Sequence, residues 1–138
     1  MQYILITNSF KKNLKKFKKY FTGQDIIDDI KDFAINGLRK SETYLKSLPI
    51  NDGSLNIAKL RITIRRVRGR YLLGVLESQE KTEYLPIIID LKKGKHGKNL
   101  SFLSNKNTVK AINQAIISIV DDYVDHTKIN PTMDIYEI

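Results

Sequence analysis

Residues 57–77 read IAKLRITIRRVRGRYLLGVLE, which is two apolar runs separated by a basic turn. In the first run, apolar side chains at every second position alternate with polar ones, a period that is typical of a half-buried strand. Gly69 lies between the runs and favours a tight turn. We therefore predict a β-hairpin whose strands cover residues 57–67 and 70–77.

A third apolar run, EYLPIIIDLK at residues 83–92, is expected to extend the hairpin into an antiparallel sheet. The apolar side chains of this sheet should face a core, and the opposite face should be basic. The basic residues of that face and of the following loop are Lys59, Arg61, Arg65, Arg70, Lys93, Lys95, His96 and Lys98. A cationic face of this kind suits a phosphate backbone.

The chain before the hairpin opens with a predicted strand at residues 2–7, which are strong strand formers. A helix should follow, because phenylalanine and leucine residues recur from Phe10 to Phe21 at the spacing of one helical stripe. Its other face carries six lysines, among them Lys15 and Lys19. Such a face is either simply solvated or a contact for RNA phosphates, and we take these two lysines as RNA-binding candidates.

A second helix is predicted from Thr22, whose hydroxyl can cap its first turn. Gly37 interrupts the apolar pattern, but the pattern resumes and predicts helix up to Pro49. The sequence Asn-Asp-Gly-Ser at residues 51–54 then predicts a turn.

After the sheet, Ser104 and Asn105 offer caps for a helix over residues 106–125, which has one continuous apolar face. The tail that follows Asp121 is acidic, and residues 133–138 favour a short strand. This tail either folds over the basic face and competes with RNA or merely extends the sheet or the helix.

The order of these elements predicts an α+β fold in which two helices pack on one face of a twisted, mainly antiparallel sheet and leave the other face free. A length of 138 residues favours a single domain over residues 1–138. Residues 106–138 would form its C-terminal helix and acidic extension.

Composition favours polyanionic partners, because 24 Lys and Arg against 15 Asp and Glu give a net charge of +9. Solubility alone is the other explanation of that charge. The absence of cysteine excludes disulfides, Cys-type zinc sites and thiol nucleophiles. No Gly-rich phosphate loop or Ser-His-Asp set is present. We therefore expect no metal and no small-molecule cofactor.

The two histidines, His96 and His126, are too far apart in the sequence for a histidine-based metal site. His126 has acidic neighbours. It either belongs to a weak metal site or interacts with the dipole at the C-terminal end of a helix. No apolar segment approaches the roughly 20 residues that span a bilayer, and the N-terminus lacks the features of a signal peptide. We expect a cytoplasmic protein without a membrane partner.

Three short motifs resemble the RelE/ParE superfamily of small bacterial toxins. Members of that family carry a Lys-x-Arg strand, a Gly-aromatic-Arg hairpin and a strand that ends in lysine. Here the first is similar to Lys59-Leu60-Arg61, and the second is similar to Gly69-Arg70-Tyr71, with arginine and tyrosine in swapped order. The third looks like YLPIIIDLKK at residues 84–93, and the similarity in element order covers roughly residues 3–120.

This resemblance implies the toxin of a type II toxin–antitoxin pair. RelE-like members are ribosome-dependent endoribonucleases that cut mRNA, whereas ParE-like relatives inhibit DNA gyrase. Members of both kinds are neutralised by a cognate antitoxin protein. The implied partners are therefore mRNA with the ribosome and an antitoxin.

RNA cleavage without a metal needs a base for the 2′-hydroxyl, cations on the phosphate and an acid for the leaving oxygen. We expect Arg61 and Arg65 to share one face of a strand at a spacing of roughly 7 Å, where two guanidinium groups can hold one phosphate. Arg70 on the adjacent strand would complete this clamp. The alternative is that these arginines are ordinary solvated charges.

His96 is the residue whose ordinary pKa best suits proton transfer near neutrality. Lys93 or Lys95 would serve instead if crowded positive charge lowered the pKa of the amine. Tyr71 either stacks on a base or packs in the core. Asp90, which lies beside lysines, is expected to make an ion pair.

Three functions remain open at this point. The chain is an mRNA-cleaving endoribonuclease toxin, a gyrase-inhibiting toxin without catalysis of its own, or a basic nucleic-acid-binding protein that is not toxic. The cluster of acid and base candidates at one end of a cationic sheet favours the endoribonuclease.

Overall fold

The computed structural model describes residues 1–50 and 53–138 and contains an α+β fold with an N-terminal strand and a C-terminal helix, as predicted. In chain order the elements are β1 (Gln2–Thr7), α1 (Asn8–Lys15), α2 (Gly23–Asn36), β2 (Thr43–Ile50), β3 (Gly53–Ile64), β4 (Val67–Glu77), β5 (Thr82–Leu91), the 3-10 helix η1 (Gly97–Asn99), α3 (Lys106–Asp125) and β6 (Met133–Glu137).

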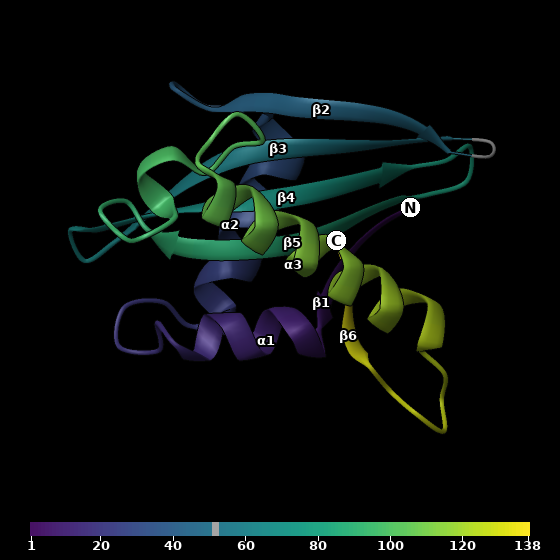
Figure 1. Cartoon of the computed structure of the whole chain (residues 1–138). Coiled ribbons are helices and arrows are strands. Elements are labelled where there is room, and N and C mark those ends of the chain that lie inside the picture. The colour runs from purple at the N-terminus through teal and green to yellow at the C-terminus, as the bar shows by residue number, and fades with distance from the viewer. Residues whose placement is uncertain (51–52) are drawn as a thin grey trace.

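Across the described residues, the strands form one sheet in the order β2-β3-β4-β5-β1-β6 (Figure 1). Neighbouring strands are antiparallel except β1 and β5, which are parallel and pair over only a short length from Gln2 to Ile4. Farther along β5, the side chain of Asn13 on α1 bonds both the N–H and the C=O of Ile89. The helix α1 therefore lies beside β5 where β1 no longer pairs with it.

The helices α2 and α3 lie on opposite faces of the sheet (Figure 1). On one face, Phe33 of α2 packs edge-on against Tyr84 of β5, with ring centroids 6.2 Å apart. On the other face, Ile119 of α3 and Ile57 of β3 line a common groove. The expectation that the second face is free is therefore wrong, because α3 covers part of it.

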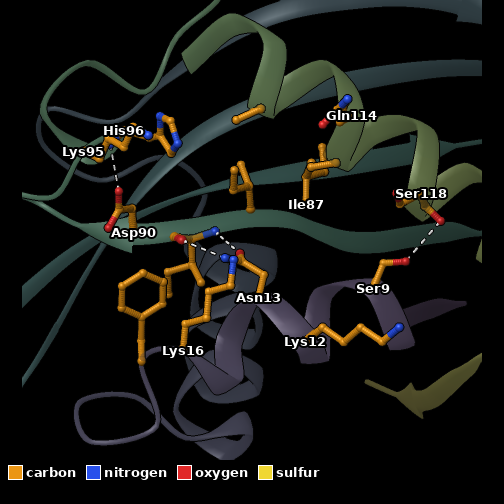
Figure 2. A pocket seen from close by; sticks show the side chains of 15 residues that line it. Ser9, Lys12, Asn13, Lys16, Ile87, Asp90, Lys95, His96, Gln114 and Ser118 are labelled. Atoms are coloured by element: carbon orange, nitrogen blue, oxygen red, sulfur yellow. Dashed lines mark hydrogen bonds between the residues drawn. The ribbon is translucent and has the colours of Figure 1, made fainter. Parts of the chain in front are cut away.

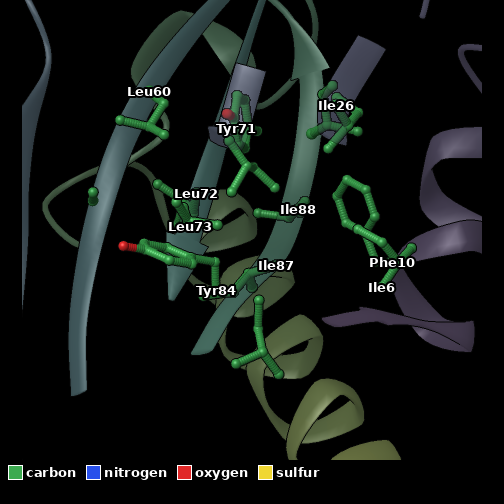
Figure 3. Close-up of a cluster of buried hydrophobic side chains, with 14 of the residues drawn as sticks. Ile6, Phe10, Ile26, Leu60, Tyr71, Leu72, Leu73, Tyr84, Ile87 and Ile88 are labelled. Atoms are coloured by element: carbon green, nitrogen blue, oxygen red, sulfur yellow. The ribbon is translucent and has the colours of Figure 1, made fainter. Parts of the chain in front are cut away.

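Side chains from several elements form a common core (Figure 3). Phe10 of α1, Ile26 of α2, Leu60 of β3 and Tyr71 of β4 are all fully buried. Burial of one such apolar side chain contributes about 1.5–3 kcal/mol. The alternation predicted for the first hairpin strand thus gives the α2 side of the sheet its apolar surface.

The second helix ends at Gly37, and the prediction of helix up to Pro49 is wrong. Gly37 has a φ of 75° and its N–H bonds the carbonyl of Phe33, which terminates α2. Residues Thr43–Ile50 form β2 instead, at the edge of the sheet, where a proline is tolerated. In the predicted turn at residues 51–54, Asn51 and Asp52 lie outside the described residues.

The hairpin turn is at Arg65 and Arg66, whose φ values are 49° and 70°, and not at Gly69. Gly69 lies inside β4 opposite Ile62. A Cβ at this glycine would come within 2.7 Å of the Phe21 ring. Close packing of that ring, rather than a turn, is what requires glycine here.

Other predicted boundaries are confirmed. Thr22 forms a capping box with Asp25, and the side chain of Asn105 accepts a hydrogen bond from the N–H of Thr108 at the start of α3. The predicted strand at the C-terminal end is β6, which pairs with β1. The tail therefore extends the sheet, and the hypothesis that it folds over the basic face is wrong.

Candidate functional site

The hairpin of β3 and β4 brings basic side chains together on the sheet face that α3 covers only in part. Arg61 and Arg70 are directly opposite each other in the ladder, and by alternation Lys59 shares their face. The N–H of Lys92, just after β5, bonds the carbonyl of Arg68. We call this surface the basic hairpin face and define it as Lys59, Arg61, Arg66, Arg68, Arg70, Lys92 and Lys93.

A hollow of about 430 Å³ lies at the tip of the basic hairpin face. Arg66, Arg68, Lys92 and Lys93 line it. Among the described residues, no carboxylate lies within 4.0 Å of a cationic nitrogen of the basic hairpin face; the ion pairs involve Lys11, Arg39 and Lys81. Within the described ranges, the cations of this surface are therefore not held in ion pairs.

Crowded like charges and desolvation lower the pKa values of two lysines on this surface. Arg68 is the main cause that lowers the pKa of Lys92, and desolvation, Arg70 and Arg61 add to it. Desolvation, and then the charge of Arg70, lowers the pKa of Lys59. Like charges in adjacent positions of a sheet are destabilising, so a bound polyanion would relieve the repulsion.

The prediction that Arg65 forms a clamp with Arg61 is wrong. It lies in the turn, exposed, and four positions beyond Arg61. Even in a straight strand, four positions correspond to about 13 Å and not to roughly 7 Å. Arg70, not Arg65, is the arginine that lies directly opposite Arg61 across the two strands, and the guanidinium of Arg61 donates to the carbonyl of Lys40 at 3.3 Å.

Asp90 organises the loop between β5 and η1. Its carboxylate accepts hydrogen bonds from the N–H groups of Leu91, His96 and Gly97 at 2.7, 2.8 and 3.2 Å. The predicted ion pair of Asp90 with a lysine is therefore wrong. Arg70 stabilises the same loop, because its guanidinium donates to the carbonyls of Gly97 and Lys98, both at 3.3 Å.

His96 is not placed beside the arginines. Its Nδ1 lies 2.9 Å from the hydroxyl of Thr108 on α3. With Lys95, it lines a cavity between α1, β5 and α3 (Figure 2). Lys93 instead lines the hollow at the hairpin tip. Lys98 is exposed on η1. The predicted acid and base candidates are therefore divided between two surfaces.

Tyr71 has a core role, and the alternative in which it stacks on a base is wrong. It is fully buried, and its hydroxyl donates to the carboxylate of Asp29 on α2. Burial, together with Asp29, raises the pKa of Tyr71 well above its ordinary value.

Behind the basic hairpin face, Arg39 bonds Asp29 and Glu42. Glu42, whose side chain is fully buried, also accepts the backbone N–H of Arg61 at 2.7 Å. Desolvation acts to raise the pKa of Glu42, but hydrogen bonds from Arg39 and from the N–H of Arg61 outweigh it and lower that pKa. The network therefore holds the strand that carries Arg61.

Two candidate lysines on the N-terminal helical segment lie away from this surface. Lys15 lines a separate hollow together with Asp134 and Tyr136 of β6. Lys19 is exposed in the turn after α1. Neither lysine belongs to the basic hairpin face.

The Nδ1 atom of His126 accepts the N–H of Thr132 at 3.1 Å, which uses one ring nitrogen in the connection from α3 to β6. Among the described residues, no group of three or more His, Asp or Glu side chains is placed to hold a metal ion. We assign His126 a structural role in that connection.

Sequence reasoning did not select Arg66, Arg68 and Lys92. The run Arg-Arg-Val-Arg at residues 65–68 was the available signal, but the turn was placed at Gly69 and the register was therefore not known. The network of Arg39 and Glu42 had no local signal, because its partners come from three separate segments.

Comparison of the chain with protein-family models, with curated proteins and with solved structures finds no match. Within the described ranges, no helix combines the length and the apolar character that crossing a bilayer requires.

Proposed function

We propose that this chain is the RelE-like toxin of a type II toxin–antitoxin pair and that it binds the RNA backbone through the basic hairpin face. The observation that carries this proposal is the set of cations on that face without a carboxylate partner among the described residues. Guanidinium and ammonium groups that gather without countercharge are the electrostatic pattern of a phosphate-binding surface. The order of elements, with a strand and two helices before an antiparallel hairpin, also supports it.

In the proposed reaction, the 2′-oxygen of a ribose attacks the adjacent phosphorus and loses its proton to a base. The bond from phosphorus to the 5′-oxygen breaks, and that oxygen takes up a proton, which leaves a 2′,3′-cyclic phosphate and a 5′-hydroxyl. Arg61 and Arg70, opposite each other in the sheet, would stabilise the charge that develops on the phosphate oxygens.

Lys92 is the best candidate for the base in this proposal. It belongs to the same surface as the two arginines, and their charge and that of Arg68 lower its pKa. His96, with Lys93 or Lys95 in its place, was the sequence-based candidate. The position of the His96 side chain in a different cavity makes Lys92 the better choice.

The proposed partners are mRNA on the ribosome and a cognate antitoxin that carries acidic residues complementary to this surface. A cytoplasmic location is part of the same proposal. A second candidate function is nucleic-acid binding without catalysis, and the separation of His96 from the arginine pair favours it.

The proposal is tested by induced expression in a bacterial host, with mRNA cleavage mapped by primer extension. Growth arrest with mRNA cuts is expected for the wild type and for Lys18→Ala, an exposed lysine outside the basic hairpin face. The cuts should disappear in Arg61→Ala and Lys92→Ala. Arrest with intact mRNA and blocked supercoiling would instead indicate a gyrase target, and the absence of arrest would leave the binding function alone.

A further inference from the structure

A cavity of about 610 Å³ forms a trough between α1 and α3 over the strand β5 (Figure 2). We propose that this trough is a binding site for a nucleoside phosphate. The inference extends the proposed function, since it concerns a surface other than the basic hairpin face.

The walls of the trough follow from helical spacing. On α1, Ser9 and Lys12 face it with Lys16 of the following turn, and on α3 the small residues Ala111 and Ala115 face it at a spacing of one turn. Because these alanines have no bulk to fill the space, the two helices do not close over the strand.

Hydrogen bonds hold the trough in shape. Asn13 is anchored to the backbone of Ile89 on the floor, at 2.7 and 3.3 Å. At one end, Ser9 donates its hydroxyl to Asp122 at 2.7 Å. The same hydroxyl lies 3.4 Å from the carbonyl of Ser118 (Figure 2). The site is therefore built before any ligand arrives, which lowers the entropic cost of binding.

The rim of the trough is cationic. Lys12, Lys16 and Lys95 line it, and among the described residues none of them makes an ion pair. The one carboxylate in the lining, that of Asp90, already accepts backbone N–H groups. The ligand that this rim favours is therefore an anion.

The floor of the trough is apolar. Ile87 and Phe17 contribute to it, and the ring of Phe17 offers a flat surface. An inorganic phosphate would leave this floor unused, whereas a base can stack on the ring while its phosphate reaches the lysines. A cavity of about 610 Å³ also lies within the range of small-molecule sites.

The nucleoside phosphate can be a free mononucleotide or one unit of an RNA strand. Lys93 lines the hollow at the hairpin tip and Lys95 lines the trough, so the two surfaces share one loop. Two residues span at most about 7 Å, which is close to the spacing of successive phosphates in a strand. Binding of an RNA unit in the trough rests on the proposed function, whereas binding of a free mononucleotide does not.

The first test is calorimetric titration of the full chain with adenosine 5′-monophosphate, adenosine and inorganic phosphate. The monophosphate should bind at least about tenfold more tightly than either of the others, because only it uses both the floor and the rim. If inorganic phosphate binds as tightly as the nucleotide, or if none of the three binds, the inference is overturned.

The second test compares matched variants. The double variant Lys12→Gln with Lys16→Gln should lower the affinity for the nucleotide by about tenfold or more. The control, Lys18→Gln with Lys128→Gln, removes the same charge from exposed sites outside the trough and should change that affinity less than twofold. Ala115→Leu keeps the charge and the helix propensity but fills the trough, and should also abolish binding. Equal losses in the test and control pairs would overturn the inference.

A labelled RNA octamer with a 5′-phosphate distinguishes the two sources. Displacement of bound nucleotide by the octamer supports an RNA unit in the trough. Binding of the nucleotide by a protein that does not bind the octamer supports a free mononucleotide site and counts against the proposed function alone. RNA binding without any nucleotide binding overturns the inference and leaves the proposed function intact.

Discussion

The basic hairpin face and the trough are both cationic, but they differ in what lies beneath the charge. At the hairpin tip, two arginines and two lysines line one hollow together with Val67 and Leu91. The trough spreads fewer cations around an apolar floor. A dense array of cations suits a repeating backbone, whereas fewer cations around an apolar floor suit one discrete ligand.

The two surfaces also differ in how they are supported. Glu42, which is buried and forms an ion pair with the partly exposed Arg39, holds the hairpin strand at the N–H of Arg61. Neutral hydrogen bonds from Asn13 hold the floor of the trough at Ile89. This difference predicts that the loss of one charged group destabilises the hairpin more than the floor of the trough.

Glu42→Gln should have the largest effect. It leaves Arg39 without its buried partner, and we expect a loss of about 3 kcal/mol in the free energy of unfolding, measured in denaturant. Hydrogen exchange should accelerate more at the N–H of Arg61 than at the N–H of Ile89. Equal acceleration at both positions would contradict the separate support of the two surfaces.

The same carboxylate predicts a pH dependence. Because the pKa of Glu42 is lowered in the folded chain, its contribution to stability is present above the pKa that it has when unfolded and is lost as the pH falls through its folded pKa. Glu42→Gln should remove this part of the acid sensitivity. Glu80→Gln, at an exposed site, should leave the profile of stability against pH unchanged.

Gly97→Ala should affect both surfaces, because Gly97 lies in the loop that joins them. An added Cβ would lie 1.8 Å from the carbonyl oxygen of Leu91, so the loop must move. We expect a loss of about 2 kcal/mol in the free energy of unfolding, with amide shift changes at Arg70 and at His96. Gly23→Ala, where no atom lies within 4 Å of the added Cβ, is the control and should be neutral or slightly stabilising. An unchanged free energy of unfolding in Gly97→Ala would show that the loop has room for a Cβ at this position.

The smallest expected effect concerns titration. Arg68 is the main cause of the lowered pKa of Lys92, so Arg68→Gln should raise that pKa toward its ordinary value, as measured by NMR of the side-chain amine. Arg66→Gln, in the adjacent turn, should raise it less. A larger rise in Arg66→Gln than in Arg68→Gln would mean that Arg68 is not the main charge acting on Lys92.

Elements with a strong local signal could be predicted from the sequence. The bounds of α3 follow from the cap at Asn105 and from an apolar stripe that continues over the whole helix. The strand β2 could not be found in this way, because its apolar residues also fit a helix. Pairing with β3, together with Gly37 at the end of α2, decides its conformation.

The basic hairpin face was predicted only in part. Arg61 and Arg70 were placed on a common face, which their pairing confirms. The turn was missed because Arg65 and Arg66 adopt positive φ values, where glycine or asparagine is usual. The side chain of His96 turns toward α3 through Thr108, a contact between distant segments that no pattern in the loop indicates.

The measurement that most directly tests the central proposal is the salt dependence of binding to single-stranded RNA. Arg66→Gln, Arg68→Gln and Lys93→Gln together should weaken binding roughly a hundredfold near 0.1 M salt and reduce the slope of log K against log salt by about 2. A control that removes the same charge at exposed Lys18, Lys106 and Lys128 should retain nearly the wild-type slope. Equal losses in both variants, or an unchanged slope in the first, would contradict the assignment of RNA binding to the basic hairpin face.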